Sequence, residues 1–311
     1  MRRFIEMLSK KGAVINNNEN QVAAATAVKD YWTDHNVTSH KTFLSEDESL
    51  SYFKWRNDQY FKYIDYMPVT GFDGKVVLDF GCGPGHDLVG FGVYSDPKKL
   101  IGIDVSARSL SEASDRLKIH GVTAELIQLD PNLINIPMDD MSVDHIHSSG
   151  VLHHTPDPLI WLKEMYRVLK PSGSINIMVY NYDSIWMHLY VAYQRSIVQG
   201  LYSDLSLREQ FAKSTDGEDC PISNCYKSDE WIEFCNKAGF DAEFIGAAIS
   251  MHEASLVNLR FAAIQDQRTP QESRQFLLNL EFDIHGFPLS NGFYAGVDAC
   301  YRLYRKGSNN A

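Results

Sequence analysis

The stretch Val77-Leu78-Asp79-Phe80-Gly81-Cys82-Gly83-Pro84-Gly85 has the pattern of a buried strand that ends in a glycine-rich turn. Glycines at such a place allow positive φ and a close approach of the backbone to a ligand. A helix that begins after the turn points its N-terminal amides at the crevice beyond the strand. The stretch therefore predicts a strand, a turn and a helix at a ligand-binding edge of a sheet.

Short apolar runs and amphipathic stretches alternate along the rest of the chain. Strands are predicted at 76–78, 100–103, 125–129, 143–148, 175–179, 242–249 and 297–304. Helices are predicted after Ser106, over about 158–169, 184–200 and 229–237, and within a helical insertion at roughly 251–281. Strands separated by helices predict an α/β fold, a doubly wound Rossmann-like sheet with right-handed crossovers.

Three regions are predicted to flank or form this sheet. Residues 1–70 are expected to be an N-terminal helical cap, 71–182 the core, and 183–311 a substrate-binding region of helical inserts and the last two strands. The spacing Ser45-x-x-Glu48 is a capping box, so a helix is predicted to begin at Ser45 and to continue past Tyr60. The first 20 residues and the Gly-Ser-Asn-Asn-Ala tail are expected to be loosely ordered.

Composition narrows the class of protein. The chain has 311 residues, is 44% hydrophobic and carries a net charge of −11, so it can form a large core and lacks the basic surface that phosphate contacts require. Because of this charge we expect no nucleic acid as a partner. We also expect no membrane as a partner, because no run of 18 apolar residues exists. The five cysteines are scattered, which is typical of a reducing compartment such as the cytoplasm. Cys220 and Cys225 do not have the spacing of a zinc pair, so no metal is predicted.

Three aspartates indicate which ligand the glycine turn would take. Asp79 stands two residues before the first glycine, where it would repel a dinucleotide pyrophosphate and attract an ammonium group. Asp104 ends the second strand of the core, where a carboxylate can accept two hydrogen bonds from a ribose diol. Asp130 ends the third strand, where an adenine amino group can be bound. His86 occupies a position at which dinucleotide-binding dehydrogenases need a small residue, so a nicotinamide oxidoreductase is disfavoured.

These residues resemble those of the class I S-adenosylmethionine-dependent methyltransferases, and in particular the small-molecule group called type 11. The resemblance covers Val76 to Tyr180, about a third of the chain, and includes the segments Gly150–Pro158 and Arg167–Gly173. It implies a seven-stranded sheet with an antiparallel last strand and S-adenosylmethionine as cofactor, with S-adenosylhomocysteine as product. The cofactor-binding residues that it implies, with those expected from the spacing, are Asp79, Gly81, Cys82, Gly83, Gly85, Asp104, Val105, Asp130 and Pro131. Arg56, on an aromatic-rich N-terminal helix, is a further candidate.

Catalytic and substrate-binding residues are predicted next to the expected methyl donor. His154, and after it His153, follow the fourth strand of the core and could take a proton from a hydroxyl or amine, although a packing role is the alternative. Tyr180, Tyr182 and Tyr60 are candidate substrate contacts. Arg56 belongs either to a lid that meets the methionine carboxylate or to a helix packed on the sheet edge. An acidic cluster is present in the loop at Asp216, Glu218 and Asp219, and either binds a cationic substrate or is solvated.

The predicted function is transfer of a methyl group to O, N or S of a small metabolite. The alternative is a protein that binds S-adenosylmethionine or S-adenosylhomocysteine without catalysis, since an intact glycine turn indicates binding but not turnover. The sequence leaves the oligomeric state open, and a homo-oligomer is compatible with it.

Overall fold

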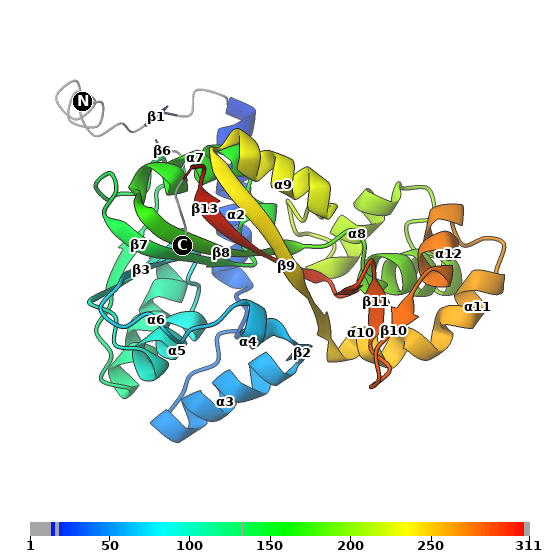
Figure 1. Ribbon diagram of the computed structural model, residues 1–311, viewed down its shortest axis with the longest axis horizontal. Helices are drawn as coiled ribbons and strands as arrows, with labels where there is room; N and C mark the ends of the chain where they lie inside the picture. Colours follow the sequence, from blue (N-terminus) through cyan, green and yellow to red (C-terminus); the bar gives the residue numbers. More distant parts are fainter. Residues whose placement is uncertain (1–13, 16–18, 132, 308–311) are drawn as a thin grey trace.

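The computed structural model describes residues 14–15, 19–131 and 133–307. Most of the first 20 residues and the last four, which the sequence predicts to be loosely ordered, lie outside the described part. Within the described part the predicted α/β architecture is confirmed (Figure 1).

The centre of the molecule is a mixed, mostly parallel sheet. Its strands, in the order in which they lie, are β2 (Tyr60–Phe61), β9 (Phe240–Ser250), β13 (Asp298–Arg305), β8 (Leu169–Tyr180), β7 (Val143–Ser149), β3 (Val76–Phe80), β4 (Lys99–Asp104) and β5 (Glu125–Gln128). β3 pairs in parallel with both β4 and β7. The strand order therefore reverses at β3, because β4 and β5 lie on one side of it and β7 and β8 on the other. The crevice beyond the ends of β3 and β7 is the switch point where such sheets bind ligands.

The predicted seven strands and the antiparallel last strand are confirmed, with one addition. β13 enters between β8 and β9 and is antiparallel to both. The eighth strand, β2, has two residues and pairs at the edge with Ile249 and Ser250 of β9. Two smaller sheets consist of β1 (Val14–Ile15) with β6 (Leu133–Ile134), and of β10 (Glu281–Phe282), β11 (Pro288–Ser290) and β12 (Phe293–Tyr294). Two- and three-residue strands are too short to give a periodic sequence pattern, so they were not predicted.

Helices cover both faces of the sheet, as a doubly wound fold requires. On one face α5 (His86–Tyr94), α6 (Ala107–Ile119) and α3 (Glu46–Asp58) contribute to an apolar cluster around Leu88 and Phe91. On the other face α7 (Pro158–Val168) and α9 (Ser228–Lys237) pack through residues such as Leu162 and Trp231. Ser106 and Asp157 cap α6 and α7 with their side chains, which fixes the residue at which each helix begins.

The N-terminal segment differs from the prediction in two ways. Ser45 caps α3 as predicted, but the helix ends at Asp58. The chain then forms β2 and turns at Lys62, with φ +73°, into the short α4 (Tyr63–Tyr66). An additional helix, α2 (Glu19–Asp34), precedes α3 and has no counterpart among the predicted helices. α2 contains no buried residue, so it lacks the apolar stripe by which a helix is found in a sequence.

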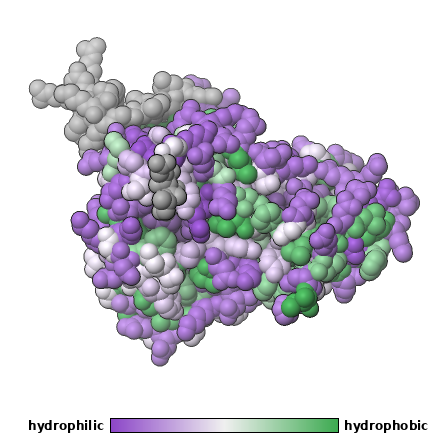
Figure 2. Space-filling view, viewed as in Figure 1, coloured by the Kyte–Doolittle hydropathy of each residue, from purple (hydrophilic) through white to green (hydrophobic). Residues whose placement is uncertain are grey.

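A second lobe extends from the ends of β9 and β13 (Figure 1). It contains a wide π-type helix η2 (Trp186–Val198), together with α8 (Leu207–Thr215), α10 (Met251–Leu256), η3 (Val257–Leu259), α11 (Arg260–Gln265) and α12 (Gln271–Leu278). Figure 2 shows a largely hydrophilic surface with hydrophobic residues gathered on this lobe, where Phe261 and Ile284 are exposed. No described helix is long and apolar enough to cross a membrane.

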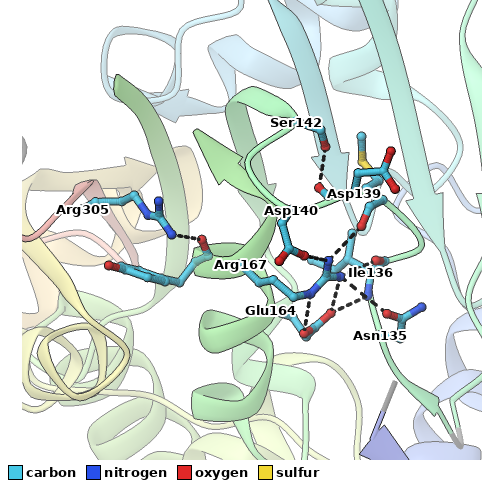
Figure 3. Close-up of polar contacts among 10 residues, drawn as sticks. Asn135, Ile136, Asp139, Asp140, Ser142, Glu164, Arg167 and Arg305 are labelled. Carbon is cyan, nitrogen blue, oxygen red and sulfur yellow. Dashed lines mark hydrogen bonds and ion pairs between the residues drawn. The ribbon is translucent and has the colours of Figure 1, made fainter. Parts of the chain in front are cut away.

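One arginine holds the segment before β7 to α7 (Figure 3). Arg167 donates to Glu164 on its own helix, to Asp140, and to the backbone carbonyls of Ile136 and Met138 at 2.7 and 2.9 Å. Glu164 in turn accepts a hydrogen bond from the backbone N–H of Ile136. The network fixes the chain between β6 and β7, just after Ile134 of β6, which lines the ligand crevice described next.

Candidate functional site

The glycine turn after β3 adopts the left-handed conformations that its composition predicts. Gly81, Gly83 and Gly85 have φ of +79°, +50° and +76°. A Cβ on Gly81 would lie 2.2 Å from Cγ2 of Val151, and one on Gly85 would lie 3.0 Å from Cβ of Ala113. The first and third glycines are therefore required both by conformation and by the close approach of Val151, which follows β7, and of α6. This packing holds the turn open toward the crevice.

Asp104, the last residue of β4, is hydrogen-bonded to the same turn. Its Oδ2 accepts a hydrogen bond from the N–H of Gly83 at 2.8 Å, and its Oδ1 accepts one from the N–H of Ser106 at 2.8 Å. Burial raises the pKa of Asp104, and the hydrogen bonds from Ser106 and Gly83 act in the opposite direction. Each carboxylate oxygen keeps a second lone pair, so the fixed carboxylate can accept bonds from a pair of hydroxyls.

Two acids near the turn differ in their access to the crevice. Asp79 is buried within β3, and burial raises its pKa. Asp87, on the first turn of α5, lines the crevice, and its Oδ2 lies 3.3 Å from Nε2 of His147. Burial opposes ionisation of Asp87, but His147, His86 and Arg56 together lower its pKa. Asp87 is therefore the carboxylate that this end of the crevice presents, eight residues after the predicted Asp79.

The crevice widens into a cavity of about 600 Å³. It is bordered by the glycine turn, by Asp104 and Val105 after β4, by the chain after β7, by the starts of η2 and β13, and by one face of α2. The predicted site residues that line it are Arg56, Tyr60, Gly81, Cys82, Gly83, Asp104, Val105, Pro131, His154 and Tyr180. The fold thus brings most of the predicted cofactor and substrate residues to one cavity.

The other predicted residues lie around the cavity without lining it. Gly85 and Asp79 belong to the turn and strand beneath it, and Asp130 is exposed beside Pro131. His153 is fully buried and stacks on Tyr180 with ring centroids 3.8 Å apart. Tyr182 is turned toward Arg208 and Lys227 in the second lobe. The structure therefore places His153 and Tyr182 where they support Tyr180 and the loop at 216–226, rather than where they contact a ligand.

His154 and Asp216 form the polar group at the far end of the cavity. His154 contributes Nδ1 to a 2.6 Å hydrogen bond with the carbonyl of Ile222, so Nδ1 carries the proton and Nε2 presents a lone pair. That Nε2 lies 3.9 Å from Oδ2 of Asp216. Burial lowers the pKa of His154, and the nearby Asp216 partly offsets the shift. The neutral, Nδ1-protonated imidazole is the form of a general base.

Asp216 is held in place by three donors. The hydroxyl of Tyr180 donates to its Oδ1 at 2.8 Å, Ser223 donates to its Oδ2 at 2.6 Å, and Tyr31 of α2 donates to its backbone carbonyl. Asp216 was one member of the acidic loop cluster, and the structure separates it from Glu218 and Asp219, which are exposed. Only Asp216 of this cluster lines the cavity.

Several residues of the cavity were not predicted from the sequence. Trp32 of α2 lies with its ring 4.7 Å from that of His154, and Trp186 of η2 lines the same end. Asp298, the first residue of β13, and Asp87 add two carboxylates. Asp87 follows the glycine motif by two residues and could have been found there, whereas Asp298 has no motif around it.

A histidine, an acid and a cysteine also meet here. One ligand atom from each of His154, Asp216 and Cys220 lies within 4.8 Å of the other two. Two of the three residues already have hydrogen-bond partners at these groups, because the thiol of Cys220 donates to the carbonyl of Ile222 and Ser223 donates to Asp216. That the protein binds no metal stays a prediction.

Comparison with known proteins identifies the domain. Residues 78–177 match the type 11 group of the family described as "Methyltransferase domain". An uncharacterized 37.1 kDa protein in transposon TN4556 of Streptomyces fradiae is 34% identical over 113 residues, which cover 36% of this chain and 32% of that protein. The demethylmenaquinone methyltransferase of Lactococcus lactis is 29% identical over 191 residues, covering 58% of this chain and 73% of that protein. This chain spans about a third to two fifths of the length of the first curated relatives it matches.

The fold agrees with this assignment. A crystal structure of an S-adenosylmethionine dependent methyltransferase from Mesorhizobium loti superposes with a TM-score of 0.50 at 14% identity, and covers 78% of this chain and 97% of that one. The 78–177 segment is a class I methyltransferase domain of the type 11 group, and S-adenosylmethionine is the cofactor of such domains. The predicted resemblance is confirmed.

Proposed function

We propose that the protein transfers a methyl group from S-adenosylmethionine to a small molecule. The observation that carries this proposal is a single cavity that joins the glycine turn and Asp104 at one end to His154 and Asp216 at the other. Donor and acceptor can therefore meet without leaving the protein. A volume of about 600 Å³ lies within the range of small-molecule sites. All five cysteines are free and buried, which supports a reducing compartment such as the cytoplasm.

The donor end offers a partner for each charged or polar part of the cofactor. Asp104 would accept from the ribose hydroxyls, and Pro131 and Leu129 would border the adenine. Arg56 would meet the methionine carboxylate, and Asp87 the methionine ammonium beside the glycine turn. Arg56 lines the cavity, so the lid interpretation of this residue is preferred here over packing on the sheet edge.

The acceptor end offers a base with a defined tautomer. Methyl transfer requires the nucleophile, the methyl carbon and the sulfonium sulfur to lie close to a line, with the reacting atoms about 3–3.5 Å apart. The sulfonium already activates the methyl group, so positioning supplies much of the rate. Nε2 of His154 would accept a proton from the acceptor, and Asp216 would stabilise the resulting imidazolium. General-base catalysis of this kind typically contributes 10²–10⁴-fold.

Identification of the ligand carried through purification tests the proposal. Mass spectrometry of the protein's extract should detect S-adenosylmethionine or S-adenosylhomocysteine, and methyl-labelled cofactor should label a metabolite in a small-molecule extract. A bound nicotinamide or an empty cavity would refute the proposal. Tight cofactor binding without label transfer to any metabolite would instead favour the non-catalytic alternative.

A further inference from the structure

The carboxylate of Asp298 is a buried charge without a partner. It is 4% exposed, stands at the first residue of β13 and lines the cavity. Among the described residues, no donor makes a hydrogen bond or an ion pair with its side chain. Buried carboxylates in folded proteins are normally paired, because the loss of hydration is otherwise uncompensated. Asp298 therefore has the character of a ligand contact rather than of a structural residue.

Arg56 is a cation that, like the anion Asp298, has no partner of opposite charge among the residues that the structure describes. It lines the same cavity, and within the described part of the chain it forms no ion pair or side-chain hydrogen bond. It lies close enough to Asp298 to favour that residue's ionised form, yet the two are not within ion-pair distance. Had they paired with each other, neither would need a ligand. Because they do not, Arg56 and Asp298 are two groups of opposite charge on the cavity wall, each open to a ligand group of the other sign.

We propose that the methyl acceptor is an amine, and that it binds as an ammonium ion between Asp298 and Asp216. This inference rests on the proposed function and names the chemical class of its second substrate. Arg56 and Asp87 account for the two charges of the methionine part of the cofactor. Asp298 and Asp216 then remain for the acceptor, next to His154.

The surroundings of the two carboxylates favour an organic cation. Tyr60, Tyr180 and Trp186 line this end of the cavity, and aromatic faces attract ammonium groups. Besides burial, the charges of Asp298 and Asp216 raise the pKa of both Tyr60 and Tyr180, so these four groups lie near one another. Arg56 is the one lysine or arginine among the described residues that line the cavity. Anionic acceptors would face both carboxylates with a single cation already assigned to the cofactor.

The reaction is balanced with the groups present. The ammonium transfers one proton to Nε2 of His154, which becomes an imidazolium facing Asp216. The freed nitrogen lone pair forms a bond to the methyl carbon, while the carbon–sulfur bond breaks and its electron pair stays on sulfur. The products are a methylated ammonium ion and neutral S-adenosylhomocysteine sulfur. The proton on His154 leaves to solvent when the product is released.

Burial also sets a pH dependence for amine binding. Burial raises the pKa of Asp298 to about 7, Arg56 lowers it, and Asp216 raises it. An ammonium ion binds the ionised form, so amine binding should strengthen as pH rises from 5.5 to 8 and Asp298 loses its proton. A neutral alcohol of the same shape should show no such dependence on Asp298.

The test measures binding of matched probes to the full chain saturated with S-adenosylhomocysteine. Calorimetry compares 2-phenylethylamine with 2-phenylethanol, and tryptamine with tryptophol, at pH 8. We expect at least one amine to bind about tenfold or more tightly than its alcohol, because the charge pair is desolvated. Asp298→Asn should abolish that preference. Glu218→Gln removes an exposed acid of the 216–226 loop and should retain it.

Each contrary outcome has a separate meaning. Equal binding of every amine and its alcohol, or an amine preference that survives in Asp298→Asn, would overturn the inference and leave methyl transfer intact. If Asp298→Asn weakens S-adenosylhomocysteine as much as it weakens the amine, Asp298 belongs to the cofactor site and the inference is wrong. Absence of S-adenosylhomocysteine binding in the unaltered protein would instead refute the proposed function.

Discussion

Replacement of Asp298 by asparagine should stabilise the protein, and the gain should grow with pH. Asparagine keeps the shape of the side chain and removes a buried charge that has no partner. Burial raises the pKa of Asp298 from 3.8 to about 7 in the folded protein. Between these two values the folded state holds a proton that the unfolded state has lost, so stability of the unaltered protein falls as pH rises. Above pH 7 both states are ionised and the loss is complete.

The size of the effect follows from the pKa difference. A shift of about 3 units corresponds to roughly 4 kcal/mol at 1.36 kcal/mol per unit, and this is an upper bound because the cavity admits water. About half of it is already present at pH 5.5. The asparagine variant should therefore gain about 2 kcal/mol more at pH 8.5 than at pH 5.5.

Urea unfolding of both proteins at pH 5.5, 7 and 8.5, without ligand, measures this difference. Glu218→Gln is the matched control, since it makes the same carboxyl-to-amide change on an exposed loop residue and should shift stability by no more than about 0.5 kcal/mol at any of these pH values. A gain in Asp298→Asn that does not depend on pH would mean that Asp298 has an ordinary pKa. A loss of stability at pH 8.5 would mean that the carboxylate has a partner, and the argument for an unpaired charge would fail.

His154→Ala should lower turnover by about 10²–10⁴-fold if the acceptor loses a proton, with S-adenosylhomocysteine affinity nearly unchanged, and would be nearly silent for a thioether acceptor; steady-state kinetics and calorimetry separate these effects. Gly81→Ala should abolish cofactor binding or folding, because residue 81 has φ +79° and its new Cβ would clash with Val151. Gly83→Ala has open space around it and should lower the free energy of unfolding by only about 1–2 kcal/mol. Circular dichroism and unfolding curves check both. Trypsin should cleave at Lys29, on the helix that lines the cavity, more slowly when S-adenosylhomocysteine is bound. Cleavage at the exposed Arg268 should keep its rate. An unchanged cleavage rate at Lys29 would mean that α2 does not cover the bound ligand.

The parts of the fold that could be predicted are those with local sequence patterns. The strands around the glycine turn are continuous apolar runs, and their helices carry side-chain caps such as Ser106 and Asp157, so their positions were predicted within a few residues. Helix α2 was not predicted, because it faces a cavity and buries no side chain. A helix of this kind leaves no 3.6-residue apolar period.

The site residues that could be predicted are likewise those that belong to a local sequence motif. Gly81 and Asp104 are linked by short-range spacing within the motif, and the structure brings both to the cavity. Asp298 reaches the cavity only because β13 enters the sheet between β8 and β9, at a distance of 242 residues from Arg56 in the sequence. The pairing of His154 with Asp216 likewise depends on the fold of the 216–226 loop, which no local pattern encodes.

Calorimetric titration of S-adenosylhomocysteine into the unaltered protein and into Asp104→Ala tests the central claim most directly. The claim is that this cavity holds the methyl donor with its ribose on Asp104. We expect one site per chain in the unaltered protein and an affinity about tenfold or more lower in the variant, because two charge-assisted hydrogen bonds are lost. Asp104→Glu should be intermediate, since the longer side chain displaces the oxygens without removing them. Absence of binding to the unaltered protein, or equal affinity of the two proteins, would contradict the account.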